Sequence, residues 1–420
     1  MIKNQMSHHK TWVEVDAAAV RHNFNVAQKI AGNAVSVMAI VKANAYGHGL
    51  REVANILTAE PDKSESKNSD SLNRKRDFRI SGGLTSDLWF GVDSIEEALI
   101  LRKDHKKNPI LILGYVPKPS IADAVKKNIS MALYDSDTLL SIAEAAKRVK
   151  KKARVHLKIE TGTYRQGIFP DNMPEFITLL IRQKKYIEVE GVYTHFSDTE
   201  NLSSRYYKEQ LQQFEQARAM LSAAHIHPAH VHTAASASLL LYPETRFTMV
   251  RWGVGLYGMY PSEEVRDRVG KSALLKPVIT WKTRIVQIKD VPKGGTVGYD
   301  RTYTAKKPIK LAILPVGYGD GYWRHLSNKG TVLVRGERAQ VAGNICMNIC
   351  MVDVTHIPKA CIGDEVVLMG KQKREHITPE EIARKVGSIN YEVPTRISPR
   401  ILRVAEISTR INPDITRTVV

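Results

Sequence analysis

A lysine stands where an apolar run ends, in a position that could hold a reactive amine. Residues 35–41 read V-S-V-M-A-I-V, a pattern typical of a buried strand, and Lys42 follows directly. Burying an ammonium is costly unless the group is paired, held uncharged or covalently engaged. Two interpretations fit: Lys42 extends its ammonium to solvent, or it is a nucleophile that forms a Schiff base with an aldehyde.

Other polar residues end or follow further apolar runs of the chain. They are Lys158, Glu160, Arg165, His195, His232, Ser236 and Arg251. Small residues accompany two of them, because Arg251 precedes W-G-V-G-L-Y-G and Ser236 ends the run H-T-A-A-S. Backbone N–H groups and a hydroxyl at the ends of neighbouring strands predict a phosphate site. A phosphate-bearing aldehyde that meets a lysine is pyridoxal phosphate.

The elements that must position these residues alternate along the chain. Apolar runs that predict strands cover 35–41, 87–92, 109–115, 130–134, 154–160, 189–196, 230–233 and 248–251. Stretches with the apolar spacing of helices lie between them, and Ser94 with Glu97 predicts the start of one. Eight such repeats predict an α/β protein with a (β/α)8 barrel over 12–270, in which the strand-end residues meet at one mouth.

The sequence pattern changes after about residue 270. Short β-rich runs and turn signals replace the helical spacing, so we expect a mainly β C-terminal domain over 271–420 that ends in a helix near 378–387. The strand-like segment 11–16 could pair with this domain, which residues 1–15 would then join. A polar stretch over 61–86 fits neither pattern and predicts a surface insertion in the barrel.

Composition limits the class of protein. The chain has 420 residues, of which 43% are hydrophobic and 25% charged, as in ordinary globular enzymes. Three cysteines and a polar N-terminus without an apolar leader indicate a cytoplasmic protein with no membrane partner. The net charge of +19 is spread in short runs without a base-reading motif, so we expect no nucleic-acid partner. His195 and His232 lack a third ligand at metal spacing, so we expect no metal.

Several blocks of the sequence together resemble one enzyme family. Residues 42–49, K-A-N-A-Y-G-H-G, look like the cofactor-attachment motif of the bacterial, pyridoxal-phosphate-dependent alanine racemases. Further blocks match in the family's order: 156–167, 193–198, 232–237, 250–258, 297–305, 313–322, 343–348 and 390–397. The resemblance runs from about residue 11 to 407. It implies a barrel followed by a β domain, and a homodimer with shared active sites.

The resemblance also implies a role for individual residues. Lys42 would carry the cofactor as an aldimine and act as one base, and Tyr299, from the partner subunit, would be the other. The cofactor-binding positions are matched by Lys42, Tyr46, His195, His232, Ser236, Arg251, Gly253, Val254 and Tyr391. The substrate-binding positions are matched by Arg165, Tyr318 and Met347. Lys158 matches a lysine that is carbamylated in many members. The implied activity interconverts L-alanine and D-alanine and supplies D-alanine for peptidoglycan.

The implied reaction agrees with the chemistry of these side chains. Racemisation removes a proton from one face of Cα and returns one to the other, so two bases must flank a planar carbanion. A lysine and a tyrosine can serve only where cationic neighbours lower both pKa values.

Two departures from the family pattern leave the substrate open. Asn344 and Asn348 stand where the family commonly has an arginine and an aspartate, and Tyr164 stands where it usually has a glycine. One alternative is therefore a racemase of broader specificity, or one for serine or lysine. Another, of a different class, is a non-catalytic pyridoxal-phosphate carrier. Such a carrier would keep Lys42 but lack the β domain and its tyrosine.

Overall fold

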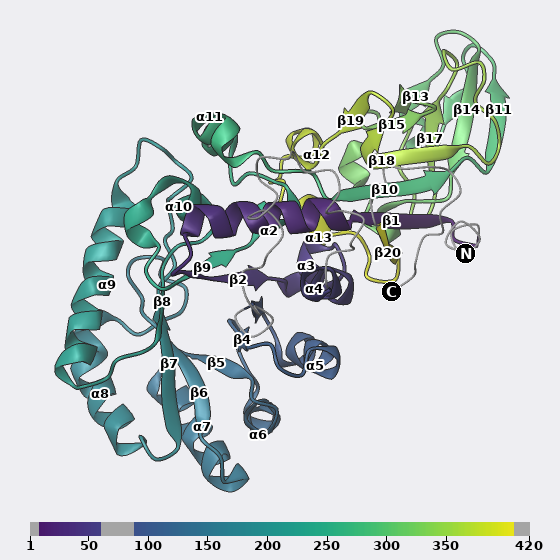
Figure 1. Ribbon diagram of the computed structural model, residues 1–420. Helices are drawn as coiled ribbons and strands as arrows, with labels where there is room; N and C mark the ends of the chain where they lie inside the picture. The colour runs from purple at the N-terminus through teal and green to yellow at the C-terminus, as the bar shows by residue number, and fades with distance from the viewer. Residues whose placement is uncertain (1–7, 60–87, 407–420) are drawn as a thin grey trace, which may run out of the picture. The chain divides into compact units, whose positions relative to one another are not determined.

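The computed structural model describes residues 8–59 and 88–406, which form two compact units (Figure 1). Of these residues, 21–42, 57–59 and 88–276 form the barrel unit, and 8–20, 43–56 and 277–406 form the β unit. The expected fold class is confirmed, because eight parallel strands make a nearly closed barrel and a mainly β unit follows. The expected insertion over 61–86 lies outside the described residues.

The barrel strands lie side by side in chain order. They are β2 (Ser36–Ile40), β3 (Trp89–Val92), β4 (Ile110–Ile112), β5 (Ser130–Leu133), β6 (Ala153–Lys158), β7 (Ile187–Tyr193), β8 (His230–His232) and β9 (Met249–Trp252). Each pairs in parallel with its neighbour from β8 down to β2, and β2 pairs with β9. Backbone bonds from Thr248 to Val231 (3.2 Å) and from Arg251 to Ala234 (3.0 Å) link β9 to β8. The carboxyl ends of all eight strands therefore share one rim.

Helices lie outside the barrel strands (Figure 1). In the barrel unit they are α2 (Ala17–Ala31), whose first residues belong to the β unit, α5 (Ile95–Asp104), α6 (Ile121–Lys126), α7 (Ser136–Val149), α8 (Met173–Arg182), α9 (Tyr206–Ala223), α10 (Ser236–Leu241) and α11 (Glu263–Val269). The helix α4 (Leu50–Thr58) lies mostly in the β unit. Ser94 caps α5, since its hydroxyl accepts from the Glu97 N–H at 3.4 Å. The Glu97 carboxylate accepts from Asp93 instead of from Ser94, at 3.1 Å.

The β unit contains a ten-stranded sheet and a small two-stranded one. The strands of the large sheet are β1 (Thr11–Asp16), β10 (Ile279–Arg284), β11 (Gln287–Val291), β14 (Ile309–Leu314), β15 (Thr331–Val334), β16 (Glu337–Val341), β17 (Cys350–Asp353), β18 (Glu365–Gln372), β19 (Glu375–Ile377) and β20 (Leu402–Glu406). The small sheet pairs β12 (Thr296–Val297) with β13 (Tyr303–Thr304). Two helices follow, α12 (Pro379–Val386) and α13 (Glu392–Thr395).

Two early segments of the chain group with the β unit rather than with the barrel. β1 pairs antiparallel with β10 and parallel with β20, which places it inside the large sheet. The segment Ala43–Ile56 also packs in this unit. The sequence predicts that residues 1–15 join the β domain and that residues 43–56 belong to the barrel.

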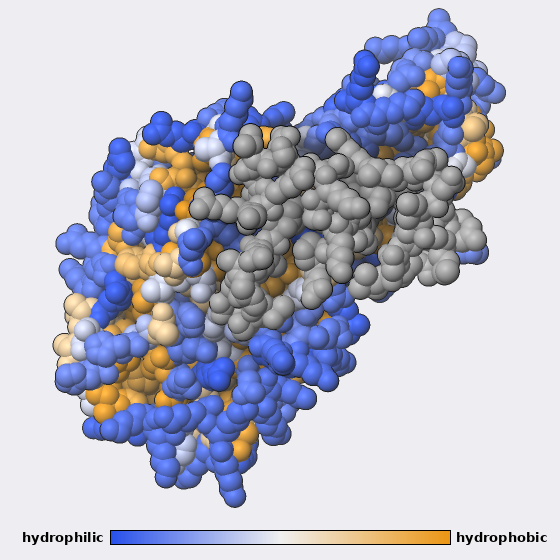
Figure 2. Space-filling view, in the orientation of Figure 1, coloured by the Kyte–Doolittle hydropathy of each residue, from blue (hydrophilic) through white to orange (hydrophobic). Residues whose placement is uncertain are grey.

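The surface is mostly polar. Hydrophilic residues cover much of the face drawn in Figure 2, and apolar residues show between them in small groups. In the β unit, Tyr299, Tyr318, Met347 and Ile349 are large side chains that remain exposed. Within residues 8–59 and 88–406, no helix is both long and apolar enough to cross a membrane.

Candidate active site

Arg251, near the carboxyl end of the strand β9, is the centre of a buried hydrogen-bond network. Its Nη1 donates to His232 at both the ring Nδ1 (2.8 Å) and the backbone carbonyl (2.7 Å). Its Nη2 donates to the carbonyls of Thr194 (2.8 Å) and Thr233 (3.0 Å) and lies 3.3 Å from His195 Nδ1. Burial lowers the pKa of Arg251 to about 10, so the guanidinium remains charged at neutral pH.

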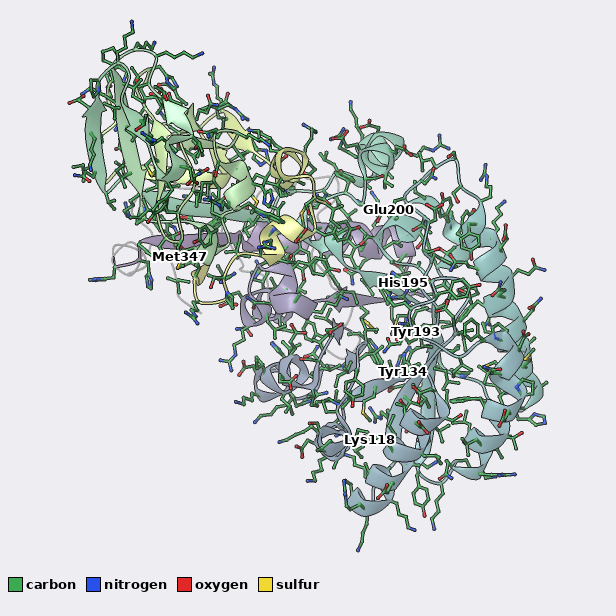
Figure 3. All side chains as sticks on the ribbon, turned by 180° about the vertical axis from the view of Figure 1, so that it is seen from behind. Lys118, Tyr134, Tyr193, His195, Glu200 and Met347 are labelled. Atoms are coloured by element: carbon green, nitrogen blue, oxygen red, sulfur yellow. The ribbon has the colours of Figure 1, made fainter. Side chains whose placement is uncertain are left out.

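His195 and His232 are neutral acceptors in this network. Burial, followed by the charge of Arg251, holds the pKa of both rings well below the usual value. A guanidinium can only donate, so Nδ1 of each ring accepts and the ring proton lies on Nε2. Tyr193 stacks on His232 with ring centroids 4.7 Å apart and planes 5° apart. Figure 3 shows Tyr193 and His195 together in the barrel unit.

Lys158, the last residue of β6, is a buried amine among cationic groups. Its Nζ donates to Gln166 Oε1 at 3.1 Å and lies 5.8 Å from the centre of the Tyr193 ring. Burial, followed by the charges of Arg165 and Arg251, lowers the pKa of Lys158 to about 8. About a tenth of this amine is therefore neutral, and so nucleophilic, at pH 7.

The loop after β6 folds around a carboxylate. Glu160 Oε1 accepts from the N–H groups of Gly162 and Thr163, both at 2.7 Å, and Oε2 accepts from that of Arg165 at 3.1 Å. Burial raises the pKa of Glu160, but the backbone donors outweigh it and bring the pKa below the usual value. Arg165 is thereby placed beside Lys158 on a cavity lined by Lys158, Ile159, Glu160, Thr163, Arg165, Gln166, Thr194 and His195.

Ser236 begins α10 and meets the segment that follows β9. Its Oγ accepts from the N–H groups of Gly253 (3.2 Å) and Gly255 (3.5 Å). A Cβ on Gly255 would lie 2.2 Å from the Trp252 ring, so only glycine allows the backbone to approach this closely. Val254 starts a short 3-10 helix, Val254–Tyr257. The Ser236 hydroxyl and the N–H groups of the segment after β9 therefore lie close together, and such donors can bind a phosphate group.

Lys42 follows β2 and begins an unusual turn. Its Nζ lies 3.8 Å from Asp93 Oδ1, and 41% of its side chain is exposed. Within α3 (Lys42–Tyr46), residues 43–45, and Tyr46 at its end, have φ between 52° and 54°, which makes the turn left-handed. For residues other than glycine this conformation costs about 1–2 kcal/mol each, so neighbouring groups must hold it.

The β unit supplies the groups that hold this turn. Arg403 Nε donates to the Gly47 carbonyl at 3.1 Å, and its Nη atoms donate to the carbonyls of Ile397, Ser398 and Ile401. A Cβ on Gly47 would lie 1.9 Å from the Pro394 carbonyl oxygen, so only glycine fits there. The rings of Tyr46 and Tyr391 lie in the same unit, with centroids 6.4 Å apart.

The remaining predicted site residues are exposed on the β unit. Tyr299 is 69% exposed, Met347 58% and Tyr318 42%. Asn344 Nδ2 donates to the Tyr299 carbonyl (3.1 Å) and to Asp300 Oδ2 (3.0 Å). One of the two unusual asparagines therefore holds the turn that carries Tyr299.

Each unit brings part of the predicted site together. In the barrel unit, one connected group contains Lys158, Arg165, His195, His232 and Arg251, and Ser236 meets Gly253 in the same unit. In the β unit, Tyr46 lies beside Tyr391. Sequence reasoning assigned no role to His156, Glu190 and Tyr193. They lie within β6 and β7. The sequence feature that could have pointed to them is a polar side chain inside a run that predicts a buried strand.

Comparisons with known proteins agree on one family. The family model for the alanine racemase N-terminal domain matches residues 15–63 and 87–261. The model for the alanine racemase C-terminal domain matches residues 278–405. Together these matches cover more than half of the chain.

Individual relatives match over nearly the whole chain. Alanine racemase of Carboxydothermus hydrogenoformans is 38% identical over 393 residues, which are 94% of this chain and 98% of that protein. Alanine racemase of Methanococcus maripaludis is 36% identical, over 95% of this chain and 99% of that protein. The structure of alanine racemase from Clostridium difficile 630 matches with a TM-score of 0.84 at 32% identity, over 98% of this chain and 99% of that one.

Proposed function

Because the chain belongs to the alanine racemase family, a family of isomerases, we propose that it interconverts L-alanine and D-alanine with bound pyridoxal 5'-phosphate. One observation carries the proposal: a buried, charged Arg251 held by neutral acceptors alone. Such a group can donate to the nitrogen of a ring without giving up its own proton. The product D-alanine would serve peptidoglycan synthesis.

The residues present fit this cofactor. The Ser236 hydroxyl and the N–H groups of Gly253 and Val254 suit a phosphate, and the family resemblance assigns the same role to Tyr46 and Tyr391. The Lys42 amine suits an aldehyde carbon, and Arg251 suits the ring nitrogen. When bound, pyridoxal phosphate withdraws electrons from the amino acid and makes its Cα proton acidic.

Two bases would move the proton. Lys42 Nζ would take it from, or return it to, one face of Cα, and the Tyr299 hydroxyl would serve the opposite face. We infer that Tyr299 comes from a second copy of the chain in a homodimer. Its exposure, together with that of Tyr318 and Met347, supports this inference, because large side chains left in solvent mark surfaces that meet a partner.

Arg165 would bind the carboxylate of the substrate, with the Met347 backbone N–H as a second donor and Tyr318 at the entrance. We also infer that Lys158 reacts with carbon dioxide, which forms an N–C bond and releases one proton. The partly neutral amine, with its pKa of about 8, supports this step. The resulting carbamate would place a negative charge beside Arg165 and orient it.

The decisive experiment compares the purified wild type with Lys42→Ala, and with Lys29→Ala as an exposed control. We expect wild type and control to show the visible absorbance of bound cofactor and to interconvert the enantiomers of alanine. Lys42→Ala should lack that absorbance and should interconvert the enantiomers far more slowly. A wild type without cofactor absorbance and without turnover would contradict the proposal.

A second candidate is a racemase with a wider range of substrates. Asn344 and Asn348 replace a charged pair of the family pattern, and the large side chain of Tyr164 stands beside Arg165. Comparing kcat/KM for alanine, serine and lysine decides between the two. A preference for alanine of at least about tenfold, or about 1.4 kcal/mol, would favour the first candidate. A pyridoxal-phosphate carrier is disfavoured, because residues 278–405 match a racemase domain.

A further inference from the structure

A line of buried side chains continues from Arg251 into the barrel interior. Arg251 Nη1 lies 2.8 Å from His232 Nδ1, and His232 Nε2 lies 2.8 Å from Nδ1 of His156 in β6. His156 Nε2 lies 3.5 Å from Oε2 of Glu190 in β7. Both imidazole rings are completely buried.

The two ends of this line determine where its protons lie. Arg251 can only donate, so His232 Nδ1 accepts and the proton of His232 is on Nε2. That N–H donates to His156 Nδ1, so the proton of His156 is on its own Nε2. This last N–H faces Glu190 Oε2, which lies 3.5 Å from Nε2, beyond hydrogen-bond geometry but close enough for the carboxylate charge to favour a proton on this nitrogen. A donor-only group at one end and an acceptor-only group at the other allow a single arrangement.

Glu190 is itself held as an anion. The Ser130 hydroxyl donates to its Oε2 at 2.5 Å, and Arg154 Nη1 lies 3.7 Å from Oε1. Burial raises the pKa of Glu190, but the contacts with His156 and Ser130 outweigh it and leave the pKa below the usual value. The carboxylate therefore keeps its charge at neutral pH.

The strand β7 leaves room for the ring of His156. A Cβ on Gly191 would lie 2.2 Å from His156 Nδ1, so the ring fits only because residue 191 is glycine. Trp89 meets the His156 ring edge-on at a centroid distance of 5.4 Å. His230 lies parallel to it at 6.0 Å. The ring orientation is therefore fixed by packing as well as by hydrogen bonds.

We propose that His156 and Glu190 are positioning residues, which fix the tautomer of His232 and so hold Arg251 in place as a donor toward the active site. The part of this inference that concerns the cofactor rests on the proposed function. The other tautomer of His232 would turn an N–H toward the guanidinium, which would lose its hydrogen bond to Nδ1 and be pushed from its position among the remaining acceptors. Glu190 thus acts on the site from the far end of the line.

The first test uses cofactor-free protein with ¹⁵N-labelled histidine. Long-range proton–nitrogen spectra at neutral pH distinguish the two neutral tautomers and the charged ring, and His156→Gln assigns the signals. We expect both His156 and His232 of the wild type to be neutral with the proton on Nε2. A charged His156, or the other tautomer at either ring, would overturn the proposal. This measurement needs no Glu190 variant, so a variant that fails to fold does not affect it.

The second test compares Glu190→Gln with Glu188→Gln, the same change at an exposed position of the same strand. A glutamine can donate as well as accept. The rings of His156 and His232 in the Glu190→Gln variant should therefore populate the other tautomer as well. Glu188→Gln should give wild-type spectra. In loaded enzyme we expect about a tenfold fall in kcat with little change in KM for Glu190→Gln alone, as is common when a residue that orients a histidine is lost.

The outcomes separate this inference from the proposed function. Equal spectra and equal kcat for the two variants would overturn the inference, and restoration of the wild-type tautomers by Glu190→Asp would support it. If the wild type racemises no alanine, the proposed function fails. The tautomers in the cofactor-free protein would still decide whether the line of side chains works as described.

Discussion

Tyr164 has a backbone conformation that side chains seldom adopt. Its φ is 52°, and 79% of the residue is exposed. The neighbouring N–H groups of the loop bond to Glu160, which fixes the backbone in this shape. Its ring meets that of Phe169 at a centroid distance of 6.1 Å. The loop conformation, rather than packing, sets which residue suits this position.

Replacing Tyr164 by glycine and by alanine should separate strain from packing. Both changes remove the ring, but only alanine retains a Cβ in the left-handed region. We expect Tyr164→Gly to have a free energy of unfolding about 1 kcal/mol higher than that of Tyr164→Ala. Urea unfolding of the two variants measures the difference, and an alanine variant that is equally or more stable would contradict it.

Asn344 governs the turn that presents Tyr299. It donates to the Tyr299 carbonyl and the Asp300 carboxylate, and Asp300 has a φ of 60°. Asn344→Ala removes both bonds, so the hydroxyl of Tyr299 should be less well placed. We expect kcat to fall about tenfold, which corresponds to about 1.4 kcal/mol of barrier. The same substitution at the exposed Asn33 should leave kcat unchanged. Wild-type turnover by Asn344→Ala would show that the turn holds its shape alone.

The sequence identified the strand-end residues but not those behind them. Lys158, His195 and Arg251 were found because polar residues end apolar runs, and the structure joins them in one network. His156 and Glu190 lie inside strands, where a polar residue is as consistent with a solvent-facing side as with a buried network. Only the pairing of β6 with β7 and of β7 with β8 brings them into line.

At the scale of elements, the left-handed turn after Lys42 depends on a distant strand. The βα alternation was predictable from local spacing, because strands and helices have different apolar periods. The turn was not predictable, because its conformation is unfavourable locally. It is held by Arg403 in β20 and by a close approach of the Pro394 carbonyl, both more than 300 residues away in the chain.

Arg403→Lys should therefore loosen the turn. A lysine keeps the charge but cannot match the planar set of donors that bonds to the carbonyls of Gly47, Ile397, Ser398 and Ile401. We expect a loss of about 2 kcal/mol in the free energy of unfolding, because hydrogen bonds from the charged group to buried carbonyls are lost, together with weaker cofactor binding. Arg400→Lys, at an exposed position nearby, is the control. Stability equal to that of the control would show that Pro394 and the local bonds suffice.

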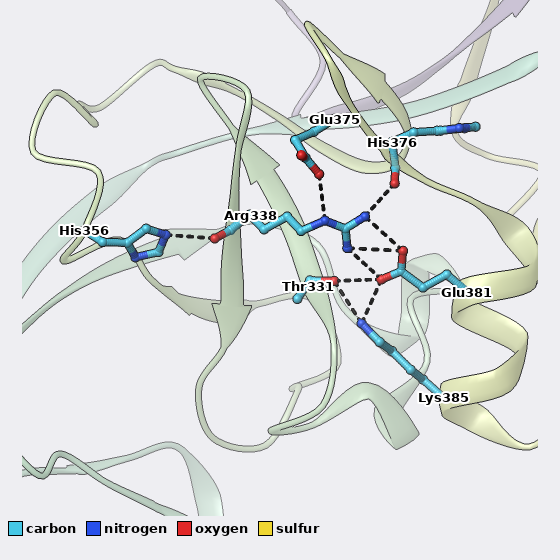
Figure 4. A network of polar contacts seen from close by, with 7 residues as sticks. All are labelled: Thr331, Arg338, His356, Glu375, His376, Glu381 and Lys385. Carbon is cyan, nitrogen blue, oxygen red and sulfur yellow. Dashed lines mark hydrogen bonds and ion pairs between the residues drawn. The ribbon is translucent and has the colours of Figure 1, made fainter.

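On the scale of the whole molecule, charge pairs join elements far apart in the β unit. Arg338 in β16 bonds to Glu381 in α12 through both Nη atoms, and its Nε donates to Glu375 at 2.8 Å (Figure 4). Lys385 donates to Glu381 and to Thr331, each at 2.9 Å. This network fastens α12 to the strands β15 and β16 of the large sheet.

The network should make the free energy of unfolding depend on pH in the acidic range. Burial raises the pKa of Glu381, but Arg338 and Lys385 outweigh it and lower the pKa to about 2 from its ordinary value of 4.5. A depressed pKa means that the stabilisation is complete above pH 4.5 and is lost as the pH falls toward 2. We expect Glu381→Gln to melt below wild type at neutral pH, with the difference shrinking in acid. Glu337→Gln is the exposed control, and a difference that does not change with pH would contradict the prediction.

The close approach of Gly191 to the ring of His156 also has an evolutionary consequence. Any side chain at 191 would collide with the imidazole, so a change at 191 depends on which residue stands at 156. Substitution at 191 becomes acceptable only after residue 156 has become smaller, whereas 156 can change first. In a lineage that has lost the histidine, the glycine is free to drift. In one that keeps it, the glycine persists without touching substrate or cofactor.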